Sequence, residues 1–292
     1  MKEIERIFKK ALYKVYLNHE NLGNKGEEII KNYRFREETL LADWEAEKVV
    51  INTLREERFP AEIVSEEHGV VILDNNAKYL VLIDGIDGTR VFKESDGRGR
   101  YGTIISVFET TNPKYEDSLF GGIVEHSTNR LFYGLKGKGS FLEFLRTGNK
   151  EKIHCSGVKK LRNTRRIYID ESFEINKRIF SDNLDNFNTL CLWASAAHYI
   201  DTALGVSDLA LECTRKGNLE IASSYRLIKE AGGVMVDLHG NSLESERYLN
   251  WGQIETIPVI TAATKELAKD LIQHIKSRRE LSSSFFYFSG NI

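Results

Sequence analysis

Two aspartates three positions apart stand at the end of a long apolar segment. Tyr79-Leu80-Val81-Leu82-Ile83 runs directly into Asp84-Gly85-Ile86-Asp87-Gly88-Thr89. Such a run, bounded by Asp and Gly, predicts a buried strand with its acids at the carboxyl end, which is the end where open α/β sheets bind ligands. Carboxylates held close together need a shared proton or a cation between them, and oxygen ligands suit Mg²⁺. The segment therefore predicts a magnesium site.

The two glycines extend this prediction to the backbone. Gly85 and Gly88 allow a sharp turn and a close approach to a ligand, so the Ile86 carbonyl is a candidate metal ligand. Thr89 then stands at the start of a helical turn, where the free amides of Gly88, Thr89 and Arg90 form a pocket for an anion. A strand followed by an ordinary Asx-type turn is the alternative, because Asp and Gly are common turn residues.

A second apolar segment also ends in acids. Ile63-Val64-Ser65 is followed by Glu66 and Glu67. For this pair a solvated loop is the alternative, because acidic pairs are frequent on protein surfaces.

These segments resemble the inositol monophosphatase-like phosphatases, which are relatives of fructose-1,6-bisphosphatase. Four signatures occur in the order of that family and cover most of the chain, from about Asp43 to Gly233. They are a helix carrying Asp43 and Glu47, the pair Glu66-Glu67, the loop 84–89, and a late helix from about Asn218-Leu219-Glu220 to Glu230-Ala231-Gly232-Gly233. The loop is a specific signal, whereas the other three mean little in isolation.

The resemblance implies a fold and a cofactor. The fold would combine α+β and α/β parts in a layered αβαβα sandwich of the inositol monophosphatase/fructose-1,6-bisphosphatase type. The cofactor would be two or three Mg²⁺ ions, held by oxygens of five residues. The implied metal ligands are Glu66, Asp84, the Ile86 carbonyl, Asp87 and Glu220.

The resemblance also implies catalytic and substrate-binding residues. The threonine of the family's loop, which pairs with an Asp on the early helix, corresponds to Thr89 with Asp43. Glu66, or Thr89 relayed to Asp43, would accept the proton of the attacking water. Small residues on a later helix and a Glu after the next strand line the substrate pocket in the family. The resemblance thus implies Ser195, Ala196 and Glu212 as substrate-binding residues, beside the anion pocket expected at Gly88, Thr89 and Arg90.

Two departures from the family pattern bear on this site. Gly85 stands where the family usually has Pro, so we expect a looser turn. Glu220 stands where the family usually has Asp after Trp, and its extra methylene moves the carboxylate outward by about 1.3 Å. Asn218 is a good N-cap and places Glu220 in the first turn of its helix, where the dipole favours an anion. Glu220 is therefore either a metal ligand or a charge that only stabilises the helix start.

The composition excludes several classes of protein. The 41 Lys and Arg nearly balance the 43 Asp and Glu of this 292-residue chain, so no basic field indicates binding to a nucleic acid polymer. The clusters 98–100 and 162–166 are expected to be solvated, although an arginine of the first could meet a substrate anion. Three widely spaced cysteines disfavour a disulfide framework and indicate a reducing compartment. Without a signal-peptide core or a membrane-spanning run, we expect a cytoplasmic protein without membrane contact.

The periodicity predicts two halves. Residues 1–150 form an α+β half with an antiparallel sheet and the metal loop, and residues 151–292 form an α/β half that completes the substrate site and the second metal site. The Gly-rich stretch 134–139 reads as a hairpin rather than a phosphate loop. The tail 282–292 is either a docked apolar segment or a subunit contact. Expected helices are 2–18, 24–33, 39–58, 174–184, 194–205, 219–231 and 264–278, and expected strands are 62–65, 79–84, 102–109, 118–126, 130–135, 165–170, 188–192, 208–213 and 233–237.

The sequence thus predicts a Mg²⁺-dependent phosphatase that hydrolyses the phosphate monoester of a small polyol or sugar, such as an inositol monophosphate. Its partner would be a small phosphorylated metabolite, and the resemblance implies a homodimer. Fructose-1,6-bisphosphate and a nucleotide 3′-phosphate such as 3′-phosphoadenosine 5′-phosphate remain alternative substrates. A catalytically weakened homologue that binds a phosphorylated ligand is a further alternative, while a purely structural protein is disfavoured because unpaired charges are rarely buried.

Overall fold

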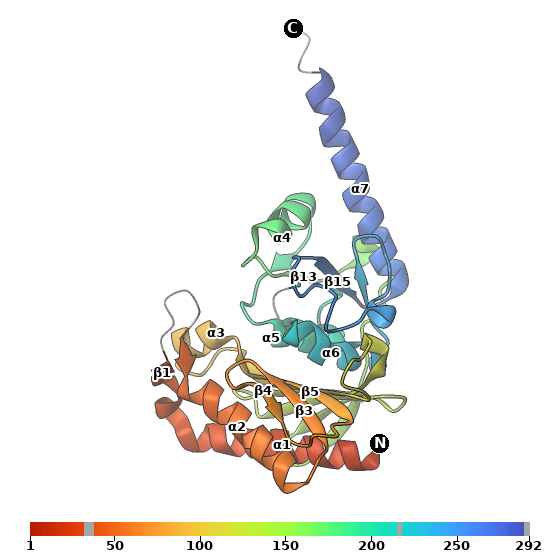
Figure 1. The fold of residues 1–292 in the computed structure, drawn as a ribbon. Helices are drawn as coiled ribbons and strands as arrows, with labels where there is room; N and C mark the ends of the chain where they lie inside the picture. The colour runs from red at the N-terminus through yellow and green to blue at the C-terminus, as the bar shows by residue number, and fades with distance from the viewer. Residues whose placement is uncertain (32–37, 215–217, 289–292) are drawn as a thin grey trace.

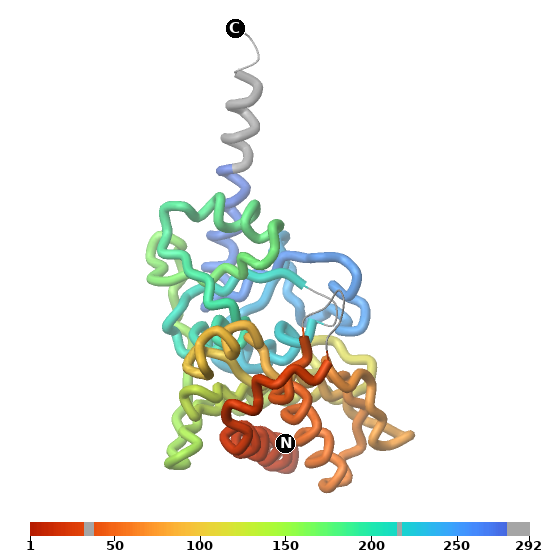
Figure 2. The backbone as a smooth tube through the Cα atoms, turned by 90° about the vertical axis from the view of Figure 1, so that its left-hand side faces the viewer, coloured from red at the N-terminus to blue at the C-terminus, as the bar shows by residue number. Residues whose placement is uncertain are grey.

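Helices and sheets alternate in layers. The computed structural model describes residues 1–31, 38–214 and 218–288, with side chains up to residue 278. Figure 1 shows, from one end to the other, α1 and α2, a first sheet containing β3 to β5, α5 and α6, a second sheet containing β13 and β15, and then α4 and α7. The same separation of N-terminal segments (red to yellow-green) and C-terminal segments (cyan to blue) is visible from the side in Figure 2. The predicted layered αβαβα sandwich is confirmed.

The first helical layer follows the sequence patterns with two exceptions. Helix α1 (Lys2–Leu22) agrees with the prediction, and α2 (Leu41–Glu56) agrees with the predicted helix 39–58 except at residues 39–40, which form a strand. The apolar sides of both helices pack against the first sheet. The predicted helix at 24–33 is wrong. A 3-10 turn, η1 (Gly23–Glu27), and strand β1 (Ile29–Lys31) stand there, and residues 32–33 lie outside the described part. Strand β1 pairs with β2 (Thr39–Leu40), and this pairing outweighs the local preference for helix.

The first sheet has eight strands in the order β10-β9-β8-β7-β6-β5-β3-β4. From β5 to β10 each strand pairs antiparallel with the next in the chain, whereas β3 and β5 run parallel. The stretch 134–139 turns between β8 and β9, as predicted. The strands are β3 (Ala61–Ser65), β4 (Gly69–Ile72), β5 (Tyr79–Asp87), β6 (Gly102–Phe108), β7 (Ser118–Glu125), β8 (Arg130–Leu135), β9 (Gly139–Phe144) and β10 (Lys150–Ile153), with η2 (Tyr115–Asp117) before β7.

The middle helices close the other face of the first sheet. Helices α5 (Ser195–Ala203) and α6 (Leu219–Glu230) supply apolar side chains such as Ala222 and Leu227 to a core shared with Leu80, Ile104 and Phe132 of the sheet. Two helices from residues 195–230 therefore cover a sheet built from residues 61–153.

The second sheet has five strands in the order β12-β11-β13-β15-β14. Strand β15, which the sequence analysis missed, lies antiparallel between β13 and β14. The remaining elements are β11 (Ile167–Ile169), β12 (Thr189–Leu190), β13 (Leu209–Cys213), β14 (Val234–Asp237), β15 (Pro258–Ala262), α4 (Glu174–Ile179), α7 (Lys265–Phe288), η3 (Leu161–Asn163), η4 (Ser181–Asn183) and η5 (Leu243–Ser245). In the tail 282–292, helix α7 continues to residue 288, but the side chains of 282–288 and all of residues 289–292 lie outside the described part. The two roles expected for the tail, a docked apolar segment or a subunit contact, therefore lie outside the described residues.

Two expectations about the whole chain concern cysteines and membranes. Cys155, Cys191 and Cys213 are all free thiols. In the part of the chain that the structure describes, no helix combines the length and the apolar character needed to cross a bilayer.

Candidate active site

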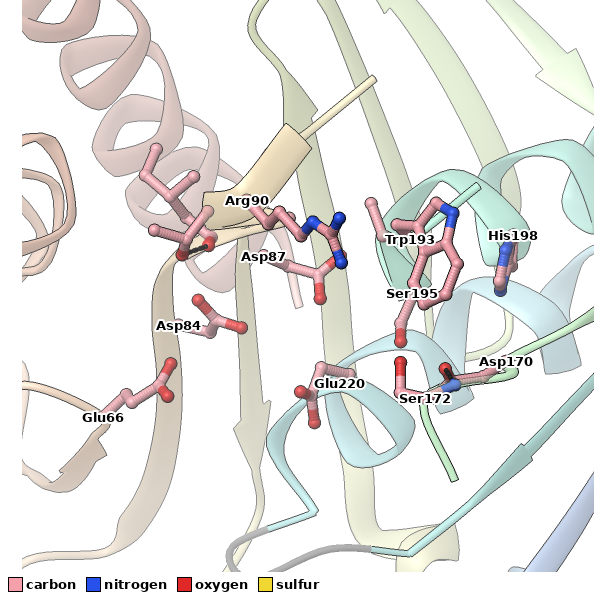
Figure 3. A pocket seen from close by; sticks show the side chains of 14 residues that line it. Glu66, Asp84, Asp87, Arg90, Asp170, Ser172, Trp193, Ser195, His198 and Glu220 are labelled. Carbon is pink, nitrogen blue, oxygen red and sulfur yellow. Dashed lines mark hydrogen bonds between the residues drawn. The ribbon is translucent and has the colours of Figure 1, made fainter. Parts of the chain in front are cut away.

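The carboxyl ends of β3 and β5 bring three acids side by side. The two strands are parallel with Ser65 opposite Ile83, so Glu66 follows one strand where Asp84 ends the regular part of the other. The β5–β6 register shifts between Asp84 and Asp87, and this irregularity turns the loop out of the sheet. Figure 3 shows Glu66, Asp84 and Asp87 facing the same space. The predicted buried strand with acids at its end is present.

Glu220 reaches this space from the first turn of α6. One carboxylate oxygen from each of Asp84, Asp87 and Glu220 lies within 4.8 Å of the others. Asp84 and Asp87 are only 3% and 6% exposed, and Asp84 Oδ1 is buried without a hydrogen-bond partner. Burial and the neighbouring charges of Glu66, Asp87 and Glu220 raise the pKa of Asp84 well above its ordinary value. An oxygen-only donor set with an orphaned buried oxygen fits a Mg²⁺ ion.

The start of α6 differs from the prediction in one contact. Asn218 is the N-cap residue, but its backbone has φ 43° and its side chain makes no capping hydrogen bond. Instead, Asn218 Nδ2 donates to the Trp251 carbonyl at 2.9 Å. A long-range contact therefore anchors the helix start that presents Glu220.

Gly85 lets α2 approach the metal loop, residues 84–89, closely. A Cβ atom at this position would lie 2.4 Å from the Asp43 carbonyl oxygen, so any side chain there would have to push α2 away. The Gly85 carbonyl also accepts a 2.6 Å hydrogen bond from Thr103 Oγ1. Contacts on both sides thus hold the turn that was expected to be looser than one with proline.

Glu47 of α2 fixes the backbone that carries Glu66. Its carboxylate accepts hydrogen bonds from the amides of Glu66 and Glu67, both at 3.0 Å, and from the Ser65 hydroxyl. Burial raises the pKa of Glu47 to about 8, although these donors favour its ionised form. Glu66 itself is exposed and lines the pocket, whereas Glu67 accepts a hydrogen bond from the Thr39 hydroxyl.

Asp43 and Thr89 are not hydrogen-bonded to each other in this structure. The Thr89 hydroxyl donates to the Ile86 carbonyl at 2.9 Å. Asp43 is 4% exposed, and its Oδ2 atom is buried without a partner. Burial, with the charges of Glu66, Glu67 and Glu47, raises the pKa of Asp43 well above its ordinary value. The Thr89 hydroxyl would have to turn away from Ile86 to meet the orphaned Asp43 oxygen.

The expected anion seat lies at the start of α3 (Thr89–Glu94). Gly88 has φ 88°, and a Cβ there would lie 2.8 Å from the Ala194 Cβ, so both the conformation and the space demand glycine. Gly88, Thr89 and Arg90 all line the pocket. The first amides of the helix have no partner within it and are free to donate to an anion.

Helix α5 closes the far side of the acids. Ser195, its first residue, lines the pocket, whereas Ala196 does not. Ala196 acts through its backbone, because its buried amide donates to Asp87 Oδ2 at 2.6 Å. The small residues predicted at this helix start therefore orient a metal-loop carboxylate.

Glu212 lies behind the pocket rather than in its lining. It is 2% exposed, and its Oε1 atom lies 2.9 Å from His198 Nδ1. The Leu192 amide donates to His198 Nε2 at 3.1 Å, so the ring proton must be on Nδ1, which donates to Glu212. His198, which no sequence motif singled out, is the pocket residue that Glu212 orients.

Arg100 differs from the expectation that the cluster 98–100 is solvated, because its side chain is only 28% exposed and is paired with acids. Its Nε atom lies 2.7 Å from Glu125 Oε1, and its Nη1 atom lies 2.7 Å from Asp201 Oδ1. Arg100 is absent from the pocket lining. It joins β7 to α5 instead of meeting a substrate anion.

The pocket has a volume of about 330 Å³, at the lower end of the range for small-molecule sites. Residues that sequence reasoning missed form its side opposite the acids (Figure 3). Its lining residues are Glu66, Asp84, Ile86, Asp87, Gly88, Thr89, Arg90, Asp170, Ser172, Trp193, Ala194, Ser195, His198 and Glu220.

Comparison with known proteins agrees with this geometry. A model of the inositol monophosphatase family matches residues 2–280 of the chain. The chain belongs to the inositol monophosphatase family. It is therefore a phosphatase, a hydrolase of phosphate monoesters, from a family that generally depends on metal ions.

Curated relatives of this inositol monophosphatase family member are named as several phosphatases. The fructose-1,6-bisphosphatase/inositol-1-monophosphatase of Methanocaldococcus jannaschii is 30% identical over 79% of this chain and 82% of its own length. The fructose-1,6-bisphosphatase of Pyrococcus furiosus is 25% identical over 85% and 87%. The bifunctional NADP phosphatase/NAD kinase of Methanococcus maripaludis is 28% identical over 77% of this chain, but the match spans only 41% of that longer protein.

Solved structures support the fold. The extragenic suppressor protein suhB of Bartonella henselae aligns with a TM-score of 0.76 over 94% of this chain and 98% of its own, at 16% identity. The IMPase of Thermotoga maritima aligns with a TM-score of 0.71 over 96% and 99%, at 19% identity.

Proposed function

We propose that this phosphatase depends on Mg²⁺ and hydrolyses the phosphate monoester of a small polyol or sugar. The observation that carries the proposal is the convergence of the Asp84, Asp87 and Glu220 oxygens within 4.8 Å, at one side of a pocket of small-molecule size. Three acids so close together are stable as carboxylates only with cations among them.

The proposed Mg²⁺ ligands are Glu66, Asp84, the Ile86 carbonyl, Asp87 and Glu220. Bound there, Mg²⁺ would neutralise charge that develops on the phosphate oxygens and lower the pKa of a water molecule. The orphaned Asp84 Oδ1 and the position of Glu220 in the first turn of α6 support this set. The hydrogen bond from Asn218 to the Trp251 carbonyl holds the helix start that carries Glu220.

The residues of the chain itself seat the phosphate and accept the proton of the attacking water. The amides at Gly88 to Arg90 seat the phosphate, so the ester bond faces the acids. A water oxygen attacks phosphorus while the bond to the alcohol oxygen breaks, and the leaving oxygen takes a proton from a solvent water and departs as the alcohol. Glu66, an exposed carboxylate held by the Glu47 contacts to its backbone, takes the water's proton directly. Thr89 relayed to Asp43 is the second route. Positioning and electrostatics supply most of the rate in such transfers.

The substrate's alcohol part occupies the side of the pocket formed by Ser195, Asp170 and His198. Glu212 contributes by holding His198. Relatives named fructose-1,6-bisphosphatase and NADP phosphatase keep a sugar bisphosphate and a nucleotide phosphate as alternatives. The remaining alternative is a catalytically weakened homologue that binds a phosphorylated ligand without turnover. The convergence of the three acids argues against it.

We further propose that the enzyme acts in the cytoplasm as a homodimer on a small phosphorylated metabolite.

Chelation tests the proposal directly. Protein stripped with EDTA should show no hydrolysis of inositol 1-phosphate or p-nitrophenyl phosphate, and activity should return with Mg²⁺. Asp84→Asn and Asp87→Asn keep shape but remove charge, so each should lower kcat by at least about 100-fold. Asp74→Asn, at an exposed turn before β5, is the matched control and should leave the rate unchanged. Full turnover in EDTA would refute the metal-dependent reading.

A further inference from the structure

Trp193 exposes a large aromatic side chain inside the pocket. It lies between β12 and α5, it is 47% exposed, and it lines the pocket together with the metal loop. Large apolar side chains are usually buried, and aromatic residues that remain exposed in a concave site commonly mark a binding surface. Neither the phosphate seat nor the acid cluster uses this residue.

The backbone beneath Trp193 is held in an unusual conformation. Trp193 has φ 58°, in the left-handed region that bulky residues rarely adopt. The preceding amide, that of Leu192, donates to His198, and His198 donates to Glu212. Because His198 is only 1% exposed and both its nitrogens are engaged, this chain of hydrogen bonds fixes the segment that presents the indole. Strained residues held in this way concentrate at ligand sites.

Arg90 links the indole to the phosphate seat. Its guanidinium carbon lies 5.4 Å from the Trp193 ring centroid, a cation–π geometry, and its backbone belongs to the proposed phosphate seat. Figure 3 shows the Arg90 side chain reaching toward Trp193, with Asp170 and Ser172 on the same side of the pocket. A flat group joined to the phosphorylated alcohol would therefore meet the indole and have polar neighbours for its edge.

We propose that Trp193 is a stacking platform for a planar heterocycle, so that the preferred substrate is a nucleotide whose ribose carries the phosphate monoester. The inference rests on the proposed Mg²⁺-dependent phosphatase function and, within it, favours the nucleotide alternative over a free polyol as the substrate. A nucleobase has an aromatic face that the indole can cover, whereas a polyol presents hydroxyls that gain more from Asp170, Ser172 and Ser195 than from an aromatic ring.

Relative rates on two substrate classes test the platform. In Mg²⁺, we compare adenosine 2′- and 3′-monophosphate with inositol 1-phosphate for Trp193→Leu and Trp193→Phe. Stacking on an aromatic residue predicts that the ratio of kcat/KM for the nucleotides to that for inositol 1-phosphate falls roughly 5- to 150-fold in Trp193→Leu, mainly through KM. Trp193→Phe keeps an aromatic face and should retain most of the ratio. Both variants keep a side chain at the strained position, so backbone strain is matched.

Leu190→Ala serves as the control, because Leu190 is 43% exposed on β12 and absent from the pocket lining. It should leave the ratio unchanged. An equal loss for both substrate classes in Trp193→Leu, or an unchanged ratio, would overturn the platform.

Fluorescence separates this inference from the proposed function. Adenosine, which needs no phosphate chemistry, should quench tryptophan emission of the Mg²⁺-loaded wild-type protein, and inositol should not. The chain has three tryptophans, and Trp193→Phe should abolish the quench. If the enzyme hydrolyses inositol 1-phosphate but adenosine neither quenches nor competes, the platform is wrong and the phosphatase function stands. If neither substrate class nor p-nitrophenyl phosphate is hydrolysed, the proposed function fails, and the adenosine quench still decides on the platform.

Discussion

Arg100→Met should destabilise the protein without changing how it binds substrate. The guanidinium of Arg100, whose side chain is 28% exposed, pairs with Glu125 and Asp201, whose side chains are 1% and 6% exposed. Removing one partner of a buried ion pair costs about 3–5 kcal/mol because a charge is left uncompensated. Here Glu125 keeps Arg130 at 2.6 Å and Asp201 keeps the Tyr168 hydroxyl at 2.6 Å, and Arg100 is partly hydrated. We therefore expect a smaller loss, about 2–3 kcal/mol of unfolding free energy.

Urea unfolding at neutral pH measures this loss. Arg98→Met, an exposed arginine two positions earlier, is the matched control and should unfold within about 0.5 kcal/mol of wild type. In a double-mutant cycle with Asp201→Asn, the Arg100→Met effect should shrink because one of the stranded carboxylates is gone.

Acid should also reduce the Arg100 effect. Burial alone would raise the pKa of Glu125, but the charges of Arg100 and Arg130 and the Thr128 hydrogen bond bring it below its ordinary value. Its stabilising contribution is thus present above the ordinary Glu pKa and is lost as pH falls through the lower folded value. An Arg100→Met variant with wild-type stability and a tenfold higher KM would refute this reasoning and would indicate that Arg100 binds the substrate.

Three further predictions concern the site and its surroundings. Glu220→Gln should raise the Mg²⁺ concentration for half-maximal activity while the melting temperature changes little; an unchanged requirement would remove Glu220 from the ligand set. Thr89→Val should keep the Mg²⁺-induced rise in melting temperature but lose turnover, and Thr89→Ser should recover it; wild-type turnover in Thr89→Val would leave Glu66 as the base. Burial lowers the pKa of His19 from an ordinary 6.5 to about 4, so its contribution to stability is complete above 6.5 and is lost as pH falls to about 4. His19→Gln should flatten that part of the stability–pH curve measured by urea unfolding, and an identical slope would show that His19 does not titrate there.

The sequence was most informative where local pattern and function coincide. Strand β5 is a continuous apolar run with its acids at the end, so both the element and the site followed from neighbouring residues. Helix α6 and its first-turn Glu220 were also predictable, because the helix pattern and the acid lie within a few positions.

The failures at residues 29–31 and at Asn218 arose because contacts with distant parts of the chain decide the local structure, whereas a local signal for β15 was overlooked. Residues 29–31 form a strand because they pair with 39–40, which no local pattern around Glu27 reveals. Strand β15 was missed although its apolar, β-branched run Pro258–Ala262 carries a usable signal, with proline tolerated at the first strand position. Asn218 was expected to cap its own helix, but Trp251 captures its amide.

The same reason explains the residues of the pocket that were missed. Trp193 and His198 can be recognised as pocket residues only in the folded chain, where they line one pocket together with Asp170 and the loop 84–89. An aromatic residue directly before a small-residue helix start was the one available local signal. Glu212 was assigned to the substrate by resemblance, and its partner His198 became visible only in three dimensions.

The way α6 covers the first sheet has a consequence for the order of synthesis. The last strand of that sheet ends at Ile153, and α6 begins at Leu219, so about 65 residues separate them. At ~5–20 residues per second, a ribosome needs several seconds to make that stretch. During this interval the face bearing Leu80, Ile104 and Phe132 lacks α6 and has at most α5 to cover it, so the nascent chain is exposed to aggregation or chaperone capture. Glu220 arrives on the same helix, so the proposed cation site is completed only when α6 removes this apolar surface from water.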